Sequence, residues 1–248
     1  MPLKLPKIIG HRGACGYAPE NTLESIKTAH EMGVEWVELD VMLTRDMIPI
    51  IFHDDTLDRT TNGSGNVADR DWEEIRQLEA GSWFSDGFAG ARIPTLEETL
   101  ELLIDLNMGL NLEIKPTPGK EVDTAEVALD FLSRVWDAHD RLLISSFSHV
   151  SLETAMDMAP DWHRGLLLET EWIPNWKEMA EYLAAATINI DGNACTRIQV
   201  ENIIDFGKPV LAYTINDPQR ARTLLQWGVD GMFTDVPDII GEILRVIH

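Results

Sequence analysis

Imidazole, carboxylate and cationic side chains stand in or just after short apolar runs in the first half of the sequence. In chain order they are His11, Arg12, Glu38, Asp40, His53, Glu113 and Lys115. Imidazoles titrate near neutral pH and can move protons, carboxylates bind hard cations, and guanidinium and ammonium groups hold anions. These residue types therefore predict proton transfer beside a bound cation, with positions left open for an anionic phosphate.

Three carboxylates are expected to share one site. Glu38 and Asp40 are two residues apart in the β-rich run VELDV, so both point to one face of a strand, and Glu113 stands in the similar run LNLEI. Three like charges in a low-dielectric cleft must be protonated, paired or bound to a cation. Pairing with Arg12 and Lys115 alone is one interpretation, but a divalent cation accounts better for three acids. Oxygen ligands favour Mg²⁺, Ca²⁺ or Mn²⁺ over Zn²⁺.

Two of the seven histidines are expected to be catalytic. Either His11 or His53 alone would more simply face solvent, but both follow apolar runs and occur together with three acids and two bases. We therefore expect one to accept a proton and the other to donate one. The remaining histidines lie on helical patterns, chain ends or polar edges and are expected to have no catalytic role; they are His30, His139, His149, His163 and His248.

Short β-rich runs alternate with longer helical patterns along the chain. Strands are expected at 7–11, 36–42, 49–53, 110–114, 142–146, 165–168, 187–191, 209–215 and 231–234. Helices are expected at 21–32, 72–79, 95–107, 121–138, 149–159, 175–186, 197–206, 217–227 and 236–247. Eight principal strands, each followed by a helix, predict a (β/α)8 barrel in which 49–53 extends or follows the second strand. Active sites of such barrels lie at the carboxyl ends of the strands, where the chemical residues fall.

Local signals mark helix ends and one insertion. Asn21 with Glu24, and Thr95 with Glu98, are each spaced as a helix-capping pair. Glycines are expected to close three helices, at Gly33, Gly207 and Gly228. Residues 57–92 are polar and Gly-rich with one short helical pattern, so we expect an inserted subdomain within a single domain spanning 1–248.

Composition restricts the partners and the compartment. The chain carries 20 Lys and Arg against 42 Asp and Glu, a net charge of −22, and such a surface repels nucleic acid and anionic membranes. No apolar run approaches the roughly 18 residues of a membrane span, and the start lacks the pattern of a signal peptide, so a soluble, cytoplasmic protein is expected. Cys15 and Cys195 fit no disulfide or zinc pattern and are expected to be reduced thiols without a role.

An ordered series of motifs covers nearly the whole chain. It consists of HRG with PENT, ELDV, PIIFHDDTLDRTTNG, IPTLEE, LEIKP, SSFS and GVDGMFTDVP. This series resembles the glycerophosphodiester phosphodiesterases. The resemblance implies a (β/α)8 barrel, a divalent metal ion, and hydrolysis of deacylated phospholipids to sn-glycerol 3-phosphate and an alcohol. A small-molecule glycerophosphodiester would be the partner, and the oligomeric state stays open.

The resemblance also implies residue roles. His11 and His53 become the acid and base pair, with His11 expected as the base. Glu38, Asp40 and Glu113 become the metal ligands, and Arg12 and Lys115 become the phosphate contacts.

One departure concerns the substrate pocket. Where many relatives have WTVN this chain has YTIN, so Tyr213 is expected to alter the pocket for the glycerol or the alcohol and not the chemistry. Within the insertion, Trp83 and Phe84 either cover the substrate or form a local core.

Two questions are left open by the sequence, the group that first attacks phosphorus and the choice between alternative functions. The first attack on phosphorus comes either from water or from the substrate's own 2-hydroxyl, and proximity favours the hydroxyl. A phospholipase-type enzyme acting on intact lipids and a phosphate-binding barrel without catalysis are the alternative functions.

Overall fold

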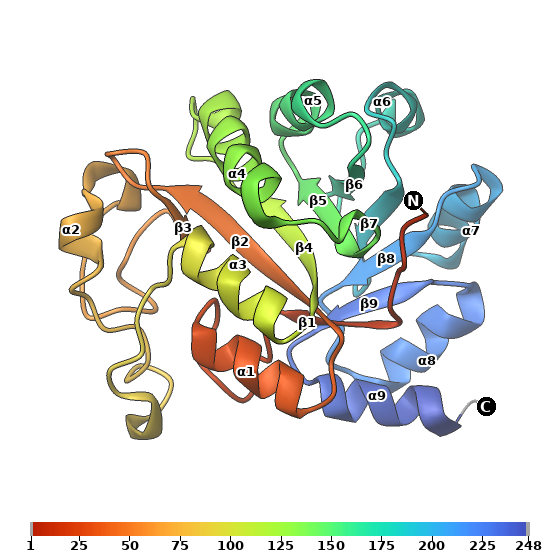
Figure 1. The fold of residues 1–248 in the computed structure, drawn as a ribbon. Helices are drawn as coiled ribbons and strands as arrows, with labels where there is room; N and C mark the ends of the chain where they lie inside the picture. The colour runs from red at the N-terminus through yellow and green to blue at the C-terminus, as the bar shows by residue number, and fades with distance from the viewer. Residues whose placement is uncertain (1, 247–248) are drawn as a thin grey trace.

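The computed structural model, which describes residues 2–246, is a (β/α)8 barrel (Figure 1). The parallel strands of the barrel are β1 (Ile8–His11), β2 (Trp36–Leu43), β4 (Gly109–Ile114), β5 (Leu142–Ser146), β6 (His163–Leu168), β7 (Thr187–Asp191), β8 (Val210–Tyr213) and β9 (Gly231–Thr234). They pair in the order β1-β9-β8-β7-β6-β5-β4-β2, and a further pairing of β1 with β2 closes the barrel. The predicted fold class is therefore confirmed.

A helix follows each barrel strand and packs on its outer side (Figure 1). These helices are α1 (Leu23–Glu31), α3 (Leu96–Asp105), α4 (Glu121–Val135), α5 (His149–Met158), α6 (Trp176–Tyr182), α7 (Arg197–Asp205), α8 (Pro218–Trp227) and α9 (Pro237–Val246). The helix expected at 236–247 extends in part outside the described residues. Two others end early: α6 stops where Ala184 adopts a positive φ of 47°, and α4 stops where Trp136 becomes extended. Among the described residues, no helix is both long enough and apolar enough to cross a membrane.

The run at 49–53 forms a short strand outside the barrel. β3 (Pro49–Ile51) pairs antiparallel with the end of β2, with Val41 opposite Ile51. The strand therefore returns along β2 and does not extend it. His53 lies two residues beyond β3, and the backbone N–H of Phe52 donates to the carbonyl of Asp40 at 2.9 Å. This hairpin carries His53 back to the mouth of the barrel.

Alternation along the strands separates a lower, apolar layer of side chains from a polar rim inside the barrel. A cluster of inward-facing residues, Ile9, Trp36, Leu143, Leu211 and Phe233, is almost fully buried. One strand step later come His11, Glu38 and Asn111, and a further step along β2 and β4 come Asp40 and Glu113, as a period of two requires. The opposite faces of the strands pack under the helices in two large apolar clusters. The polar rim is therefore supported from below by a dry, packed layer.

The helix after β1 begins one residue later than the capping pattern predicts. Thr22 is the cap residue of α1, and its hydroxyl accepts from the backbone N–H of Ser25 at 3.2 Å. The pairing of Asn21 with Glu24 was therefore wrong. Asn21 has a positive φ of 55° and turns its side chain to Asp40 instead. The Thr95 and Glu98 pair caps α3 as predicted, and Gly33, Gly207 and Gly228 have positive φ at the ends of their helices.

Residues 57–92 stand beside the barrel as a lobe of short turns (Figure 1). They contain η1 (Val67–Asp69), α2 (Trp72–Ile75) and η2 (Asp86–Phe88). A small apolar cluster joins the lobe to the β2 and β3 hairpin through Met42, Ile50, Phe52, Leu57, Val67, Ile75, Ala80 and Ile93. The helix is shorter than the predicted 72–79.

The turn after β1 predicts a stability difference between two glycines. Gly13 has a φ of +86°, and a Cβ there would lie 2.6 Å from the backbone carbon of Ser25. Gly33 has a φ of +80° with no atom within 4 Å of its Cβ position. Gly33→Ala carries only the left-handed penalty of about 1–2 kcal/mol, whereas Gly13→Ala must also move the α1 backbone. We expect Gly13→Ala to lower Tm at least about twice as much in thermal unfolding, at about 2–4 °C per kcal/mol. Equal Tm losses would contradict this packing argument.

Candidate active site

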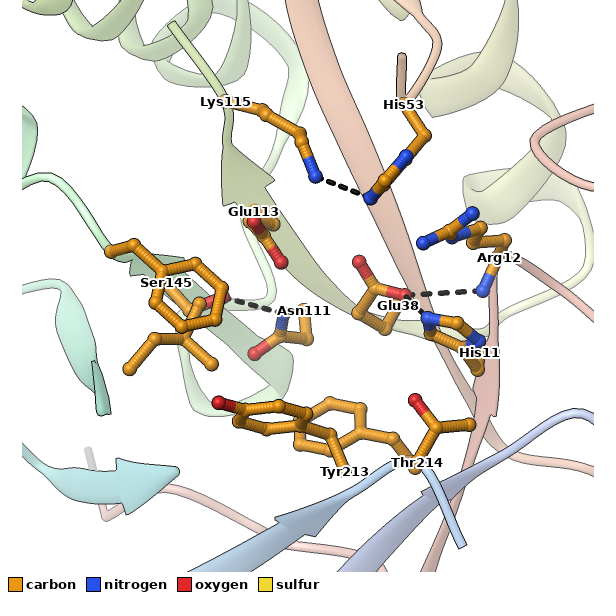
Figure 2. Close-up of a pocket in the computed structure, with 13 residues that line it drawn as sticks. His11, Arg12, Glu38, His53, Asn111, Glu113, Lys115, Ser145, Tyr213 and Thr214 are labelled. Atoms are coloured by element: carbon orange, nitrogen blue, oxygen red, sulfur yellow. Dashed lines mark hydrogen bonds and ion pairs between the residues drawn. The ribbon is translucent and has the colours of Figure 1, made fainter. Parts of the chain in front are cut away.

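A cavity of about 240 Å³ opens at the carboxyl ends of the barrel strands (Figure 2). Its lining residues are His11, Arg12, Glu38, His53, Asn111, Glu113, Lys115, Ser145, Phe147, Leu167, Tyr213, Thr214 and Phe233. The structure thus brings together all the predicted site residues. Asp40 alone does not line the cavity: it is 1% exposed and stands opposite Glu113, one strand step beyond Glu38. The volume is below the range for drug-sized ligands and suits a small polar molecule.

Glu38, Asp40 and Glu113 form the acidic floor of this cavity. One carboxylate oxygen from each lies within 4.8 Å of the others, and Asp40 stands directly opposite Glu113 in the pairing of β2 with β4. Burial and the neighbouring carboxylates raise the pKa of Glu38 well above its usual value. Burial and Asp40 raise the pKa of Glu113 to about 8. The three groups therefore oppose one another's ionisation in the absence of a cation.

Asp40 is the one member of the trio held ionised by protein groups. Although burial opposes its charge, Arg12, His53 and Lys115 hold its pKa below the usual value, helped by the Asn21 amide, which donates at 2.8 Å. Among residues 2–246, no hydrogen bond or ion pair to the Glu113 carboxylate is found. A buried charge without a partner is costly unless a ligand neutralises it. The donor set and its unmet charge therefore fit a hard divalent cation.

Arg12 is held in a constrained turn directly after β1. Its φ of 49° is uncommon for a residue with a side chain, and its backbone N–H donates to Glu38 at 3.1 Å. Its guanidinium donates to Glu20 at 2.7 Å and lies 3.4 Å from Asp40 through Nε, which is buried and makes no hydrogen bond within the described chain. Burial opposes the charge, but Asp40, Glu20 and Glu38 hold the pKa of Arg12 above its usual value. Arg12 is therefore a fixed positive charge beside the acidic floor.

His53 is oriented by a carboxylate whose own charge is compensated. Its Nδ1 lies 2.6 Å from Asp54, and Arg59 binds both oxygens of Asp54 at 2.6 and 2.9 Å. The Lys115 ammonium donates to Nε2 on the opposite side of the ring. These partners assign the proton of the neutral ring to Nδ1. Burial, together with Arg12 and Lys115, lowers the pKa of His53 although Asp40 acts in the opposite direction.

Arg59 also connects the lobe of residues 57–92 to Arg12. Its guanidinium donates to both oxygens of Glu20, at 2.7 and 2.8 Å, and Glu20 accepts from Arg12. A chain of alternating charges thus runs from Arg12 through Glu20, Arg59 and Asp54 to His53. Two bidentate contacts give this chain a defined geometry.

His11 is oriented by a carboxylate of a different kind. Its Nδ1 lies 2.6 Å from Asp235, which follows β9, and its Nε2 lies 3.9 Å from Glu38. Asp235 accepts from the Asn216 side-chain amide at 2.5 Å, and its backbone N–H donates to Oδ1 of the same Asn216 side chain at 2.9 Å. The Cys15 thiol donates to Asp235 at 2.9 Å. In the described chain no lysine or arginine pairs with Asp235, so its charge is left to His11.

An aromatic wall faces the acidic floor. Tyr213 and Phe147 meet edge to face with ring centroids 5.8 Å apart, and the Tyr213 hydroxyl donates to the carbonyl of Leu168 at 2.6 Å. Tyr213 therefore lines the cavity. Trp83 and Phe84 do not line it, since they stack with each other and with Phe88 in the lobe.

Sequence reasoning missed the residues that orient the two histidines. Asp54 is adjacent to His53 in the run HDD, and Asp235 lies in the motif FTDVP, so both were visible without an assigned role. Asn111 was missed altogether: its amide donates to Ser145 at 2.8 Å, while its buried carbonyl oxygen has no hydrogen-bond partner within residues 2–246. Asn111 could have been predicted from its position, because it lies two residues before Glu113 on the same strand and therefore on the same inward face.

The fold and this rim define a barrel hydrolase that acts on phosphate esters. A sequence model of the glycerophosphoryl diester phosphodiesterase family matches residues 11–239. A glycerophosphodiester phosphodiesterase of Caldanaerobacter subterraneus subsp. tengcongensis is 36% identical over 242 residues, covering 96% of this chain and 97% of that protein. A second, from Bacillus subtilis, is 34% identical over 258 residues, covering 96% and 86%. The chain belongs to the glycerophosphoryl diester phosphodiesterase family and is an enzyme of that class.

Solved structures agree with this assignment. A phosphodiesterase of Oleispira antarctica, in complex with its product sn-glycerol-3-phosphate, superposes with a TM-score of 0.94 at 41% identity, covering 97% of each chain. A glycerophosphodiester phosphodiesterase of Agrobacterium tumefaciens superposes with a TM-score of 0.78 at 28% identity, covering 96% and 100%. The similarity extends over essentially the whole barrel.

The unmet charge of Glu113 predicts a pH dependence of stability in the metal-free protein. Because its pKa is about 8 when folded and about 4.3 in an unfolded chain, the folded state binds more protons in this interval, and stability falls as pH rises through it. Glu113→Gln removes this loss. In thermal unfolding with a chelator, we expect the variant to gain Tm relative to the wild type between about pH 5 and about pH 9.

At high pH, excess Mg²⁺ should raise the Tm of the wild type above that of Glu113→Gln. A bound cation stabilises the wild type more than a variant that has lost a ligand. A difference in Tm that does not change with pH, or that Mg²⁺ leaves unaltered, would contradict the assignment of Glu113 to a cation site.

Proposed function

We propose that this enzyme hydrolyses small glycerophosphodiesters to sn-glycerol 3-phosphate and an alcohol at the cavity described above. The observation that carries the proposal is the gathering of His11, His53, Arg12, Lys115 and the acidic floor around about 240 Å³. Similarity to the Oleispira antarctica phosphodiesterase, whose complex holds sn-glycerol-3-phosphate, supports the same product here. The orphan carbonyl oxygen of Asn111 offers an acceptor for a glycerol hydroxyl.

Glu38, Asp40 and Glu113 would hold one divalent cation, with Mg²⁺ or Ca²⁺ preferred and Mn²⁺ accepted. The bound cation would polarise a phosphoryl oxygen and lower the pKa of a coordinated hydroxyl or water. Arg12 and Lys115 would bind the remaining phosphate oxygens. For this, Lys115 exchanges its contact with His53 for the substrate, which leaves Nε2 of His53 free to accept a proton.

The charges around the two imidazoles favour opposite proton roles. His53 is surrounded by Arg12 and Lys115, and its carboxylate partner is already paired with Arg59, so this ring is held neutral and acts as the base at Nε2. His11 faces Glu38 and an Asp235 that has no lysine or arginine partner in the described chain, and these two acidic neighbours are the reason we assign His11 the role of the acid. This proposal reverses the order expected from the sequence.

The alternative functions find less support. A phospholipase-type enzyme must approach a bilayer, and a chain with a net charge of −22 is repelled by anionic membranes. A binding barrel without catalysis would have no need of two histidines, each oriented by its own carboxylate. We also propose that 1–248 is one catalytic domain and that 57–92 is an inserted subdomain, whose Arg59 positions Asp54 and Glu20.

A coupled assay for glycerol 3-phosphate tests the activity on glycerophosphocholine, glycerophosphoethanolamine and glycerophosphoglycerol. We expect release from at least one of them with Mg²⁺, Ca²⁺ or Mn²⁺, and none in the presence of a chelator. No release with any of the three ions would overturn the substrate proposal. A 2-deoxy analogue in the same panel separates the two routes, because near inertness indicates attack by the 2-hydroxyl and turnover within about tenfold indicates attack by water.

A substrate with an activated leaving group tests the proton roles. A p-nitrophenolate needs no protonation to depart, so the glycerol phosphate p-nitrophenyl ester should bypass the acid but not the base. We expect His11→Ala to lose about 10²–10⁴-fold in kcat on glycerophosphocholine and less than about tenfold on the aryl ester. His53→Ala should lose heavily on both.

The matched control is His30→Ala, an exposed change on α1 that should alter neither rate. If instead His53→Ala is the variant rescued by the aryl ester, the roles are exchanged.

A further inference from the structure

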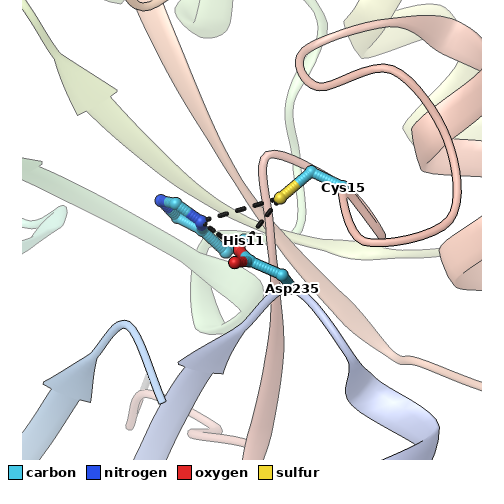
Figure 3. A group of neighbouring side chains, drawn as sticks. All are labelled: His11, Cys15 and Asp235. Atoms are coloured by element: carbon cyan, nitrogen blue, oxygen red, sulfur yellow. Dashed lines mark hydrogen bonds and ion pairs between the residues drawn. The ribbon is translucent and has the colours of Figure 1, made fainter. Parts of the chain in front are cut away.

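Three donor atoms of different chemistry converge beside the acidic floor without being part of it. They are Nδ1 of His11, Sγ of Cys15 and one carboxylate oxygen of Asp235 (Figure 3). Asp235 lies 2.6 Å from the imidazole and 2.9 Å from the thiol, and the thiol lies 3.8 Å from the imidazole. All three residues are partly exposed. The cluster is therefore reachable from solvent.

The backbone holds this cluster in place from three separate segments. The N–H of Gly16 donates to the carbonyl of Asp235 at 2.9 Å, so the loop carrying Cys15 is fixed to the end of β9. A Cβ at Gly16 would lie 2.7 Å from that same carbonyl oxygen, so the close approach requires glycine. Asn216, in the loop after β8, fixes the Asp235 carboxylate and backbone. The three donors are thus positioned before any ligand arrives.

We propose that His11, Cys15 and Asp235 form a binding site for a thiophilic divalent cation such as Zn²⁺, distinct from the carboxylate site, and that its occupation inhibits the enzyme. Sulfur and imidazole ligands select Zn²⁺, whereas the oxygen-only floor suits Mg²⁺ or Ca²⁺. A tetrahedral ion with bonds of about 2.0–2.3 Å holds its ligand atoms about 3.3–3.8 Å apart, so two of the three contacts must open by roughly 1 Å. Water would complete the coordination.

Binding exchanges protons for the metal ion in a balanced way. The Cys15 S–H bond breaks, the Sγ–metal bond forms, and one proton leaves to solvent. On His11, which as the proposed acid already carries a proton on Nε2, the Nδ1 proton also leaves to solvent, and Nδ1 then binds the ion. Thiolate and carboxylate together neutralise the two charges of the cation, and Asp235 has no lysine or arginine to lose within residues 2–246.

A metal ion in this site would prevent His11 from acting as either acid or base, a consequence that rests on the proposed function. The ring nitrogen that faces Glu38 and the cavity, Nε2, would carry a proton and could not accept another. The metal-bound ring would also be neutral, and a neutral imidazole N–H is a far weaker acid than an imidazolium. The site therefore couples a soft metal ion to the reaction without contact with the substrate.

Cobalt spectroscopy on the intact protein tests binding independently of activity. With Mg²⁺ in excess to fill the carboxylate site, Co²⁺ should produce a sulfur-to-cobalt charge-transfer band that saturates at one ion per chain and that Zn²⁺ abolishes. Cys15→Ser should lack the band, while its hydroxyl can still donate to Asp235. Cys195→Ser is the matched control, because that buried thiol lies beside Arg220 and is not one of the three donors, and it should keep the band.

Inhibition is measured in the same variants, each relative to its own rate without Zn²⁺. We expect Cys15→Ser to require at least about tenfold more Zn²⁺ for half inhibition than the wild type or Cys195→Ser. No band in the wild type, or a band that survives in Cys15→Ser, would overturn the site. Equal inhibition of all three proteins would overturn the coupling to His11. A band without glycerophosphodiester hydrolysis in any variant would confirm the site and overturn the proposed function alone.

Discussion

The crowding of three carboxylates in one small part of the barrel interior is the constraint on which the rest of the site depends. Glu38 and Asp40 are 4% and 1% exposed, and their oxygens lie within 4.8 Å of each other and of Glu113. Such a cluster cannot be fully ionised in a dry interior without added positive charge. The chain itself supplies only part of the compensating charge and hydrogen bonding, through Arg12, Lys115 and Asn21, and these groups act mainly on Asp40. The negative charge left uncompensated on Glu38 and Glu113 is what fits these residues to a cation site.

The two imidazoles at this rim differ through their carboxylate partners and not through their own exposure. Asp54 shares its charge with Arg59, so little of it is left to stabilise a proton on His53. Asp235 is held by the neutral Asn216 amide and the Cys15 thiol, so its charge acts on His11. Each imidazole thus has its Nδ1 2.6 Å from a carboxylate oxygen, but the charges around the two carboxylates differ. A reaction that needs one base and one acid at the same pH requires such a difference.

Strand alternation explains which residues of this site could be predicted from the sequence and which could not. The period of two places Glu38, Asp40 and Glu113 on the inner face, and short apolar runs followed by helical patterns predict the barrel. The pairing direction of β3 was not predictable, because an apolar run says nothing about its partner strand. Asn21 satisfied a capping pattern by spacing alone, while its side chain in the structure binds Asp40. Asp235 is 224 residues from His11, so no local pattern could join them.

The net charge of −22 and an anionic substrate can be reconciled only at the cavity itself. The field of the whole chain repels a phosphodiester, so its binding needs local positive charge, and Arg12 and Lys115 line the cavity. In the proposed function, a cation held by the acidic floor would neutralise Glu38 and Glu113, and Arg12 and Lys115 would then be less committed to the carboxylates. Cation binding and substrate binding would be linked through the same charges, and each would favour the other.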